Sequence, residues 1–336
     1  MGTIKIFVKL GGEKLENKIN NRALKPTVGT FAKRFRMQMG IQIFVILGII
    51  FLLIFSYLPM FGILMAFKKY SINDGIAGIF TSEWAGLKYF KEFIFDTRFP
   101  ELLRNTVLLS GLKLIFIFPV PILLAIILNE CKAVGFRRFV QTASYLPHFI
   151  SWVLVYNISF AFFSENTGVI NIILVRLGII DKAVPFMTGP KYFLPMAVAL
   201  AVWKTTGWSA IIFLAAISGV DPTLYEAASI DGAGRIRRIL HITLPGIKGA
   251  VVTILILSIG NLFRPGGTNF EQSYLFGNAL NSSTSEIIQT YAFKMGLANG
   301  RFSYATAVDL FQSVIAIILI MISNFVAKKT TGTSIY

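Results

Sequence analysis

The chain has 336 residues, of which 55% are apolar and 14% are charged. Because soluble domains carry roughly 25% charged residues, this composition excludes an ordinary soluble protein and indicates that much of the surface meets lipid. The formal charge of +16 is compatible with nucleic-acid binding, but a basic excess in a membrane protein commonly lies in cytoplasmic loops.

Residues 1–40 are predicted to form a basic cytoplasmic tail. Lys33, Arg34 and Arg36 are placed to meet the negatively charged inner leaflet. We expect no cleaved signal peptide, because residues 9–40 are mostly polar or basic and not an apolar stretch behind a short basic start. The first apolar segment therefore stays in the protein as a membrane anchor.

Six apolar segments are predicted to cross the membrane and to make the chain an all-α membrane protein. A helix needs about 20 residues to cross about 30 Å of hydrocarbon. The fifth segment has only 15 residues, so we expect its flanks to contribute and the bundle to bury it. No Asp or Glu falls within these boundaries. The segments are 41–67, 105–128, 139–164, 192–220, 249–263 and 310–327, within a membrane domain over 41–327 that a short tail, 328–336, follows.

The distribution of basic residues predicts the orientation. With the N-terminus inside, the inner segments carry 18 Lys and Arg and the longer outer segments carry 12. The positive-inside rule therefore places both termini in the cytoplasm. Cys131, the single cysteine, lies in an inner loop and is expected to be a reduced thiol, whereas Asn166 and Asn281 are expected to be accessible from outside.

The inner segment 219–248 carries the strongest motif of the chain. Asp221 is a good N-cap, and Pro222 suits the first position of a helix. Gly232 then breaks this helix at a turn that favours a positive φ, and a second, basic helix follows until Pro245 leads the chain back into the membrane. The two helices are predicted to be exposed to the cytoplasm.

The spacing in this segment resembles the cytoplasmic EAA loop of ABC importer permeases, which reads EAA, three residues, G, nine residues, I, one residue, LP. Further runs at 145–152, 202–208 and 299–307 resemble the carbohydrate branch, most of all permeases for polysaccharides and complex oligosaccharides. The resemblance extends from about residue 40 to the C-terminus. The expected coupling residues are Glu226, Ala227, Ala228, Asp231, Gly232, Ile242, Leu244 and Pro245.

The resemblance implies the type I importer permease (MetI-like) fold, with six transmembrane helices in a bacterial plasma membrane. It also implies three partners: a second homologous permease, cytoplasmic ATPase subunits that dock on the EAA helix, and an extracellular solute-binding protein that delivers an oligosaccharide. The chain has no GxxxxGK[ST] phosphate loop. We therefore expect ATP hydrolysis in a separate chain, with no catalytic residue, no cofactor and no nucleic acid bound here.

Two interpretations stay open for the charged residues of the loop. Glu226 could be an ordinary solvated glutamate, but that interpretation does not explain the spacing around it. Arg235, Arg237 and Arg238 either contact the ATPase or simply enforce the inside orientation.

Candidates for the substrate path lie in and beside the predicted spans. Lys204 is near the middle of the fourth segment, where an unassisted lysine costs about 2.5–3.5 kcal/mol, so it should face a watery path or a polar partner, or snorkel. Lys113 lies nearer the end of its segment. Aromatic side chains could stack on sugar faces, although ordinary packing explains them equally well. With two histidines and no acidic cluster, a metal site is not expected. The candidates are Lys204, Trp203, Trp208, Asn261, Phe263 and Tyr304.

The outer segment 264–303 is longer than a turn requires, which is typical of functional loops. Its uncharged polar residues suit a carbohydrate or a protein surface, and we expect contact with the binding protein. A secondary transporter or a channel-like protein is the alternative, but coupling to ions would call for acidic groups in the spans. A membrane enzyme would need a nucleophile and base or a metal set. The polar residues are Asn269, Gln272, Asn278, Asn281 and Ser282.

Overall fold

The computed structural model describes residues 39–262, 264 and 267–332. These residues are α-helical, and their β-structure is limited to one isolated bridge between Lys68 and Trp84. The chain falls into two compact units, one that ends at Phe61 and one from Gly62 onward. Most of the predicted tail, 1–40, lies outside the described residues.

The first unit contains one apolar helix. It runs through α3 (Met39–Leu52), η1 (Leu53–Tyr57) and α4 (Leu58–Met60). With η2 (Phe61–Phe67), the helical stretch Met39–Phe67 has 29 residues and mean hydropathy 2.7. That length exceeds the roughly 20 residues that cross a bilayer. None of α3 is buried, as expected of a helix that faces lipid or another chain.

The second unit contains three more helices long enough to cross a membrane. The first is Phe99–Glu130, formed by α7 (Phe99–Ile117) and α8 (Pro119–Glu130), which meet just before Pro119. The others are α12 (Pro190–Ser218) and α20 (Phe302–Thr331). The helices extend beyond the predicted spans. Glu101 and Glu130 therefore lie inside Phe99–Glu130, and Asp309 lies inside α20, although the predicted boundaries exclude all three. The helix α20 begins eight residues before the predicted span, and residues 303, 304, 307 and 308 of this extension are buried.

Two pairs of helices meet at a sharp bend. At the predicted third span, α9 (Val134–Tyr145) and η4 (Leu146–Phe149) meet α10 (Trp152–Phe163) at 103°. The predicted fifth span corresponds to α16 (Lys248–Leu262), and the preceding elements α14 (Arg235–Arg238), η5 (Ile239–Thr243) and α15 (Leu244–Gly246) meet it at 62°. The described residues therefore contain four spanning helices by length and composition, or up to six if each bent pair is one span.

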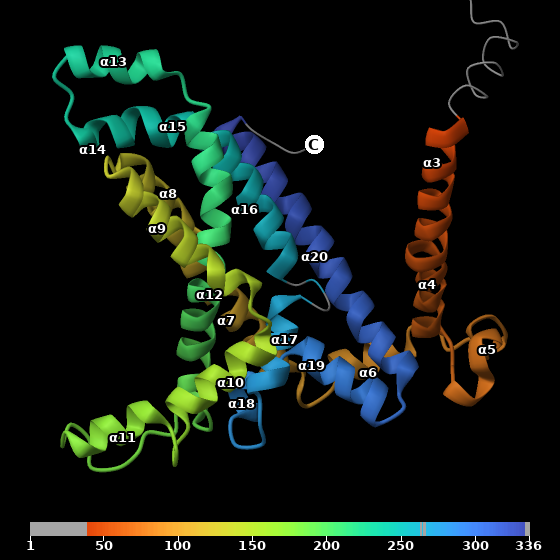
Figure 1. The fold of residues 1–336 in the computed structure, drawn as a ribbon. Helices are drawn as coiled ribbons and strands as arrows, with labels where there is room; N and C mark the ends of the chain where they lie inside the picture. The colour runs from red at the N-terminus through yellow and green to blue at the C-terminus, as the bar shows by residue number, and fades with distance from the viewer. Residues whose placement is uncertain (1–38, 263, 265–266, 333–336) are drawn as a thin grey trace, which may run out of the picture. The chain divides into compact units, whose positions relative to one another are not determined.

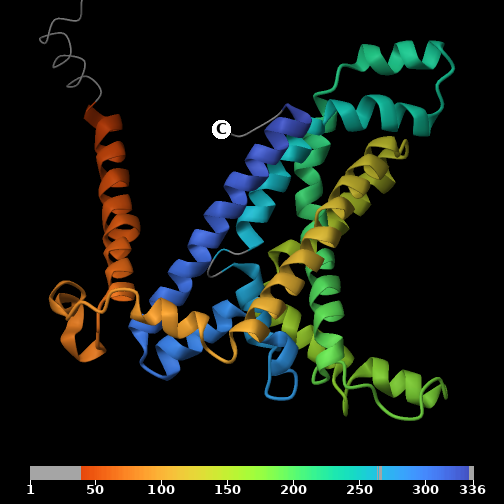
Figure 2. The same ribbon diagram turned by 180° about the vertical axis from the view of Figure 1, so that it is seen from behind.

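The elements of the second unit gather at two opposite ends. One end holds α13 (Pro222–Ile230), α14, α15, the turn between α8 and α9, and the C-terminal end of α20 (Figures 1 and 2). The other end holds α6 (Lys88–Ile94), α11 (Val169–Arg176), α18 (Ser282–Ser285) and α19 (Ile288–Phe293) (Figures 1 and 2). Within this unit, the segments predicted to be inner are thus separated from those predicted to be outer.

Candidate functional site

The EAA segment forms a helical hairpin at one end of the second unit (Figure 1). Asp221 caps α13, and its side chain accepts a hydrogen bond from the Thr223 N–H at 2.9 Å. This backbone hydrogen bond, with a further bond from the Thr223 side chain, lowers the pKa of Asp221. The helix ends before Gly232, whose φ of +71° lies in the left-handed region. Glycine adopts that conformation at no steric cost.

Side-chain contacts hold the two arms of the hairpin together. The hydroxyls of Tyr225 on α13 and Thr243 on η5 lie 3.0 Å apart. Arg238 donates to Ser229 Oγ at 2.9 Å. Arg235 forms a 3.1 Å ion pair with Glu130 at the end of α8, so the hairpin is also tied to a spanning helix.

The hairpin exposes the type of surface that a partner protein covers. The side chains of Leu224, Ile230, Ile236 and Leu240 are 51%, 87%, 73% and 53% exposed. Glu226 is exposed on the same arm as Leu224 and Ile230 and makes no ion pair with any residue in the described part of the chain. Exposed large apolar side chains accompanied by a charge are typical of protein interaction sites.

The remaining predicted coupling residues follow the same pattern. Ala227, Asp231 and Pro245 are exposed, whereas Ala228, Ile242 and Leu244 are half-buried at the base of the hairpin.

A polar cavity of about 230 Å³ lies between the spanning helices. Its walls come from α7, α8, α12, α16 and α17 (Thr268–Phe276). Apolar side chains line one part, and hydroxyl, amide and amine groups line the rest. The polar lining residues are Lys113, Thr205, Ser209, Ser258, Asn261, Thr268 and Asn269.

Lys113 is the charged group of this cavity. Its side chain is buried, and its Nζ donates a hydrogen bond to Asn269 Oδ1 at 2.7 Å. Asn269 in turn donates to Ser110 Oγ at 3.1 Å. These bonds connect α7 to α17, and they leave the ammonium group beside the cavity.

The predicted path residues do not come together at one place. Asn261 lines the polar cavity. Lys204 instead donates to the His148 carbonyl at 2.8 Å, and Trp208 stacks on the His148 ring at 4.6 Å, so both brace the bend of the third span. Trp203 lines a separate apolar groove of about 850 Å³ on another face of α12.

The other two aromatic candidates are also away from the cavity. Tyr304 is 1% exposed in an aromatic cluster with Phe93 and Tyr291. Phe263 lies outside the described residues.

Among the cavity residues, Thr205, Ser209 and Ser258 were missed by the sequence reasoning. Thr205 and Ser209 are four positions apart on α12, and Ser258 is three positions before the predicted residue Asn261 on α16. Such spacing places polar side chains on one face of a helix. Polar pairs at this spacing within apolar segments were the available signal.

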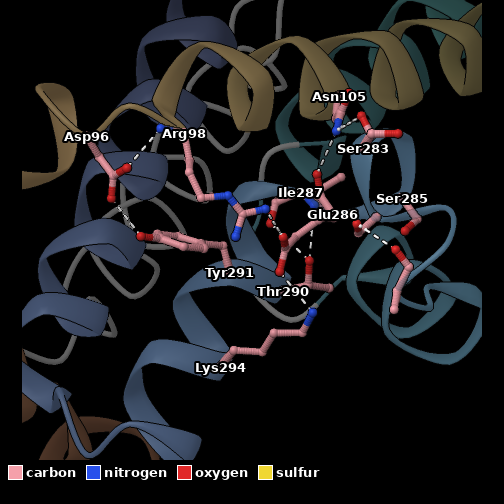
Figure 3. Close-up of polar contacts among 12 residues, drawn as sticks. Asp96, Arg98, Asn105, Ser283, Ser285, Glu286, Ile287, Thr290, Tyr291 and Lys294 are labelled. Carbon is pink, nitrogen blue, oxygen red and sulfur yellow. Dashed lines mark hydrogen bonds and ion pairs between the residues drawn. The ribbon is translucent and has the colours of Figure 1, made fainter.

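The outer segment 264–303 is folded, not extended from the surface. Glu286, 6% exposed, forms ion pairs with Arg98 and with Lys294, the latter at 2.9 Å (Figure 3). Burial acts to raise the pKa of Glu286, but the hydrogen bonds from Lys294 and Arg98 outweigh it, and the pKa lies below its ordinary value. Asn105 on α7 donates to the carbonyls of Ser283 and Glu286, both at 3.0 Å (Figure 3).

The expectation that the polar residues of this segment form an exposed surface is largely wrong. Asn269, Gln272 and Asn281 are buried, because their side chains satisfy partners within the fold. Asn281, for example, donates to the carbonyls of Met187 and Phe276. It is 1% exposed, so the expectation that it is accessible from outside is also wrong.

Comparisons with known proteins agree on one kind of protein. Residues 117–329 match the family model described as "Binding-protein-dependent transport system inner membrane component". Protein LplB of Bacillus subtilis (strain 168) is 48% identical over 282 residues, which are 84% of this chain and 86% of LplB. The polygalacturonan/rhamnogalacturonan transport system permease protein YteP of the same organism is 44% identical over 299 residues, 89% of this chain and 91% of YteP.

Solved structures show the same architecture. A chain in the crystal structure of a bacterial ABC transporter involved in import of the acidic polysaccharide alginate is similar, with a TM-score of 0.80 and 35% identity over 90% of this chain and 99% of that chain. A structure of the bacterial alginate ABC transporter in complex with a periplasmic protein bound to an alginate pentasaccharide has a TM-score of 0.79, also at 35% identity, over 90% of this chain and 99% of that chain.

Proposed function

The chain belongs to the family of binding-protein-dependent transport system inner membrane components, and from this premise we propose that it is a permease subunit of an ATP-driven oligosaccharide importer in a bacterial plasma membrane. Its relatives include permease proteins for oligosaccharide and polygalacturonan transport. The chain supplies half of a translocation path, and a second homologous permease supplies the other half. A secondary transporter or channel-like role is disfavoured by the family.

The observation that carries the proposal is the exposed hairpin formed by α13, α14 and α15. Its apolar side chains and the exposed carboxylate of Glu226, which forms no ion pair with a described residue, lie at one end of the unit. A cytoplasmic ATPase subunit covers this surface, and a basic group on that subunit pairs with Glu226. Six spans with both termini in the cytoplasm place the hairpin on the ATP side of the membrane.

The opposite end suits an extracellular solute-binding protein. This end carries α11, α18, the exposed residue Asn278 and the half-buried residue Ser282. The buried residues of 264–303 give this surface a fixed shape, because their hydrogen bonds are made inside the fold. The delivered oligosaccharide then enters the polar cavity, whose hydroxyl and amide groups match sugar hydroxyls.

The test is co-purification and uptake with the variant Glu226→Lys. The reversed charge should prevent pairing with the ATPase, so we expect normal membrane insertion, at least tenfold less co-purified ATPase subunit, and no oligosaccharide uptake. Glu165→Lys, an equal charge change at an exposed site near α11, should retain the ATPase subunit. Wild-type transport by Glu226→Lys would show that the coupling assignment is wrong. Stimulation of ATP hydrolysis by peptides and not by oligosaccharides would show that the substrate class is wrong.

A further inference from the structure

The polar cavity contains a cation, and the described residues that line the cavity include no Asp or Glu to balance it. Lys113 Nζ has three N–H donors, and one of them donates to Asn269 Oδ1. The other two have no acceptor among the residues that the structure describes. None of the lining residues is Asp or Glu.

A buried ammonium group needs a partner or water to be stable. Asn269 offers one neutral oxygen and no counter-charge. Lys204 differs, because its ammonium group donates to a backbone carbonyl and lies 5.6 Å from the centre of the Trp152 ring. Lys204 also does not line the cavity. Lys113 is thus the cation that a ligand in this cavity meets.

We propose that Lys113 binds the carboxylate of a uronic-acid residue, so that the oligosaccharides carried by this permease are acidic. This inference rests on the proposed function. A carboxylate accepts the two remaining N–H donors of Lys113 and supplies the missing negative charge. The hydroxyl and amide groups of Thr205, Ser209 and Asn261 lie around the same cavity and match the hydroxyl groups of the sugar ring.

The size of the cavity limits what it holds at one time. Its volume of about 230 Å³ is below the roughly 300–1,000 Å³ typical of sites for drug-sized ligands. The cavity therefore takes about one sugar residue in this conformation, and successive residues of an acidic oligosaccharide pass Lys113 one after another.

A purely structural role for Lys113 makes a different prediction. The bond to Asn269 joins α7 to α17, so a structural lysine would affect folding and assembly and leave the choice between acidic and neutral sugars unchanged. The experiment must therefore measure that choice.

The test is equilibrium dialysis with the assembled permease and ATPase complex, without the binding protein, whose own selectivity would otherwise contribute. The probes are labelled trigalacturonate and trimannuronate, each beside its carboxyl-reduced neutral form. We expect the wild-type complex to bind at least one acidic probe about 10- to 100-fold more tightly than its neutral form, the range for a hydrogen bond to a charged group. Lys113→Gln should lose this preference, and Lys204→Gln should keep it.

A second variant replaces the carboxylate of the ligand by a carboxylate of the protein. Asn269→Asp supplies an internal anion to Lys113 and should also remove the preference. Equal binding of acidic and neutral probes by the wild type, binding of neither, or a preference that persists in Lys113→Gln would overturn the inference. A different result would refute the proposed function: no oligosaccharide stimulates ATP hydrolysis when the binding protein is present.

Discussion

Replacing Glu286 by glutamine removes the negative charge that pairs with Arg98 and Lys294. The Glu286 side chain is 6% exposed, whereas those of its partners Arg98 and Lys294 are 41% and 54% exposed. Breaking a fully buried ion pair costs about 3–5 kcal/mol, and an exposed pair contributes about 0.2–1 kcal/mol. Because water screens the two cations, we expect the free energy of unfolding to fall by about 1–3 kcal/mol.

The measurement is the apparent unfolding midpoint of the purified permease complex in detergent. The control is Glu83→Gln, which breaks the ion pair with Lys69 at the same 2.9 Å distance, although the Glu83 side chain is 72% exposed. We expect a clear decrease for Glu286→Gln and little change for the control. Equal shifts in the two variants would refute the reasoning that burial determines the strength of this cluster.

The pH dependence of the same cluster has a definite sign. The pKa of Glu286 is lowered in the fold, so its contribution to stability is fully present above the ordinary glutamate pKa of about 4.3. The contribution is lost as the pH falls through the lowered pKa. The midpoints of the wild type and Glu286→Gln should therefore differ at pH 7 and converge in acid.

Two further predictions concern the hairpin and the orientation. Gly232→Val forces a branched side chain into a φ of +71°, which costs about 1–2 kcal/mol; the variant should abolish stimulated ATP hydrolysis while membrane insertion stays normal. The control Gly234→Val, at a φ of −66°, should reduce stimulated ATP hydrolysis less. Equal losses in the two variants would contradict the role of the positive φ. Cys131 should react with an impermeant maleimide only after the cells are permeabilised. A cysteine introduced by Asn166→Cys, at an exposed position, should react in intact cells. Labelling of Cys131 in sealed cells would overturn the predicted orientation.

The long apolar helices could be predicted from the sequence because bilayer thickness fixes their length. The bend of the third span could not. It lies at Ile150 and Ser151, where Ser151 caps α10, and it is braced by Lys204 and Trp208 from a distant part of the chain. An uncharged run gives no sign of such a brace, because hydropathy measures only what each residue contributes alone.

The two intramembrane lysines show a second limit. Position along a segment favoured Lys204 over Lys113 as the path residue, but depth does not say which way a side chain faces. The structure turns Lys204 toward the His148 carbonyl and Lys113 toward the cavity. The polarity of Asn281 was misleading for a related reason, since an amide that satisfies buried carbonyls is as polar in sequence as an exposed one.

The EAA spacing was informative because it describes a structure formed by residues close together in the sequence. A capped helix, a glycine turn and a returning arm are fixed by neighbouring residues, and Asp221 and Gly232 adopt the expected cap and turn. What these residues do for an ATPase depends on a second chain. Their coupling role therefore remains a prediction.

The hairpin has short structural connections to two walls of the polar cavity. Through the ion pair of Arg235 with Glu130 it is tied to the end of α8, which continues as one span into α7 and Lys113. Through α15 it continues directly into α16, which carries Asn261. A displacement of the hairpin therefore acts on helices that contribute Lys113 and Asn261 to the cavity wall. If both helices move as rigid elements, such a displacement changes the distance between these two side chains and therefore the shape of the cavity.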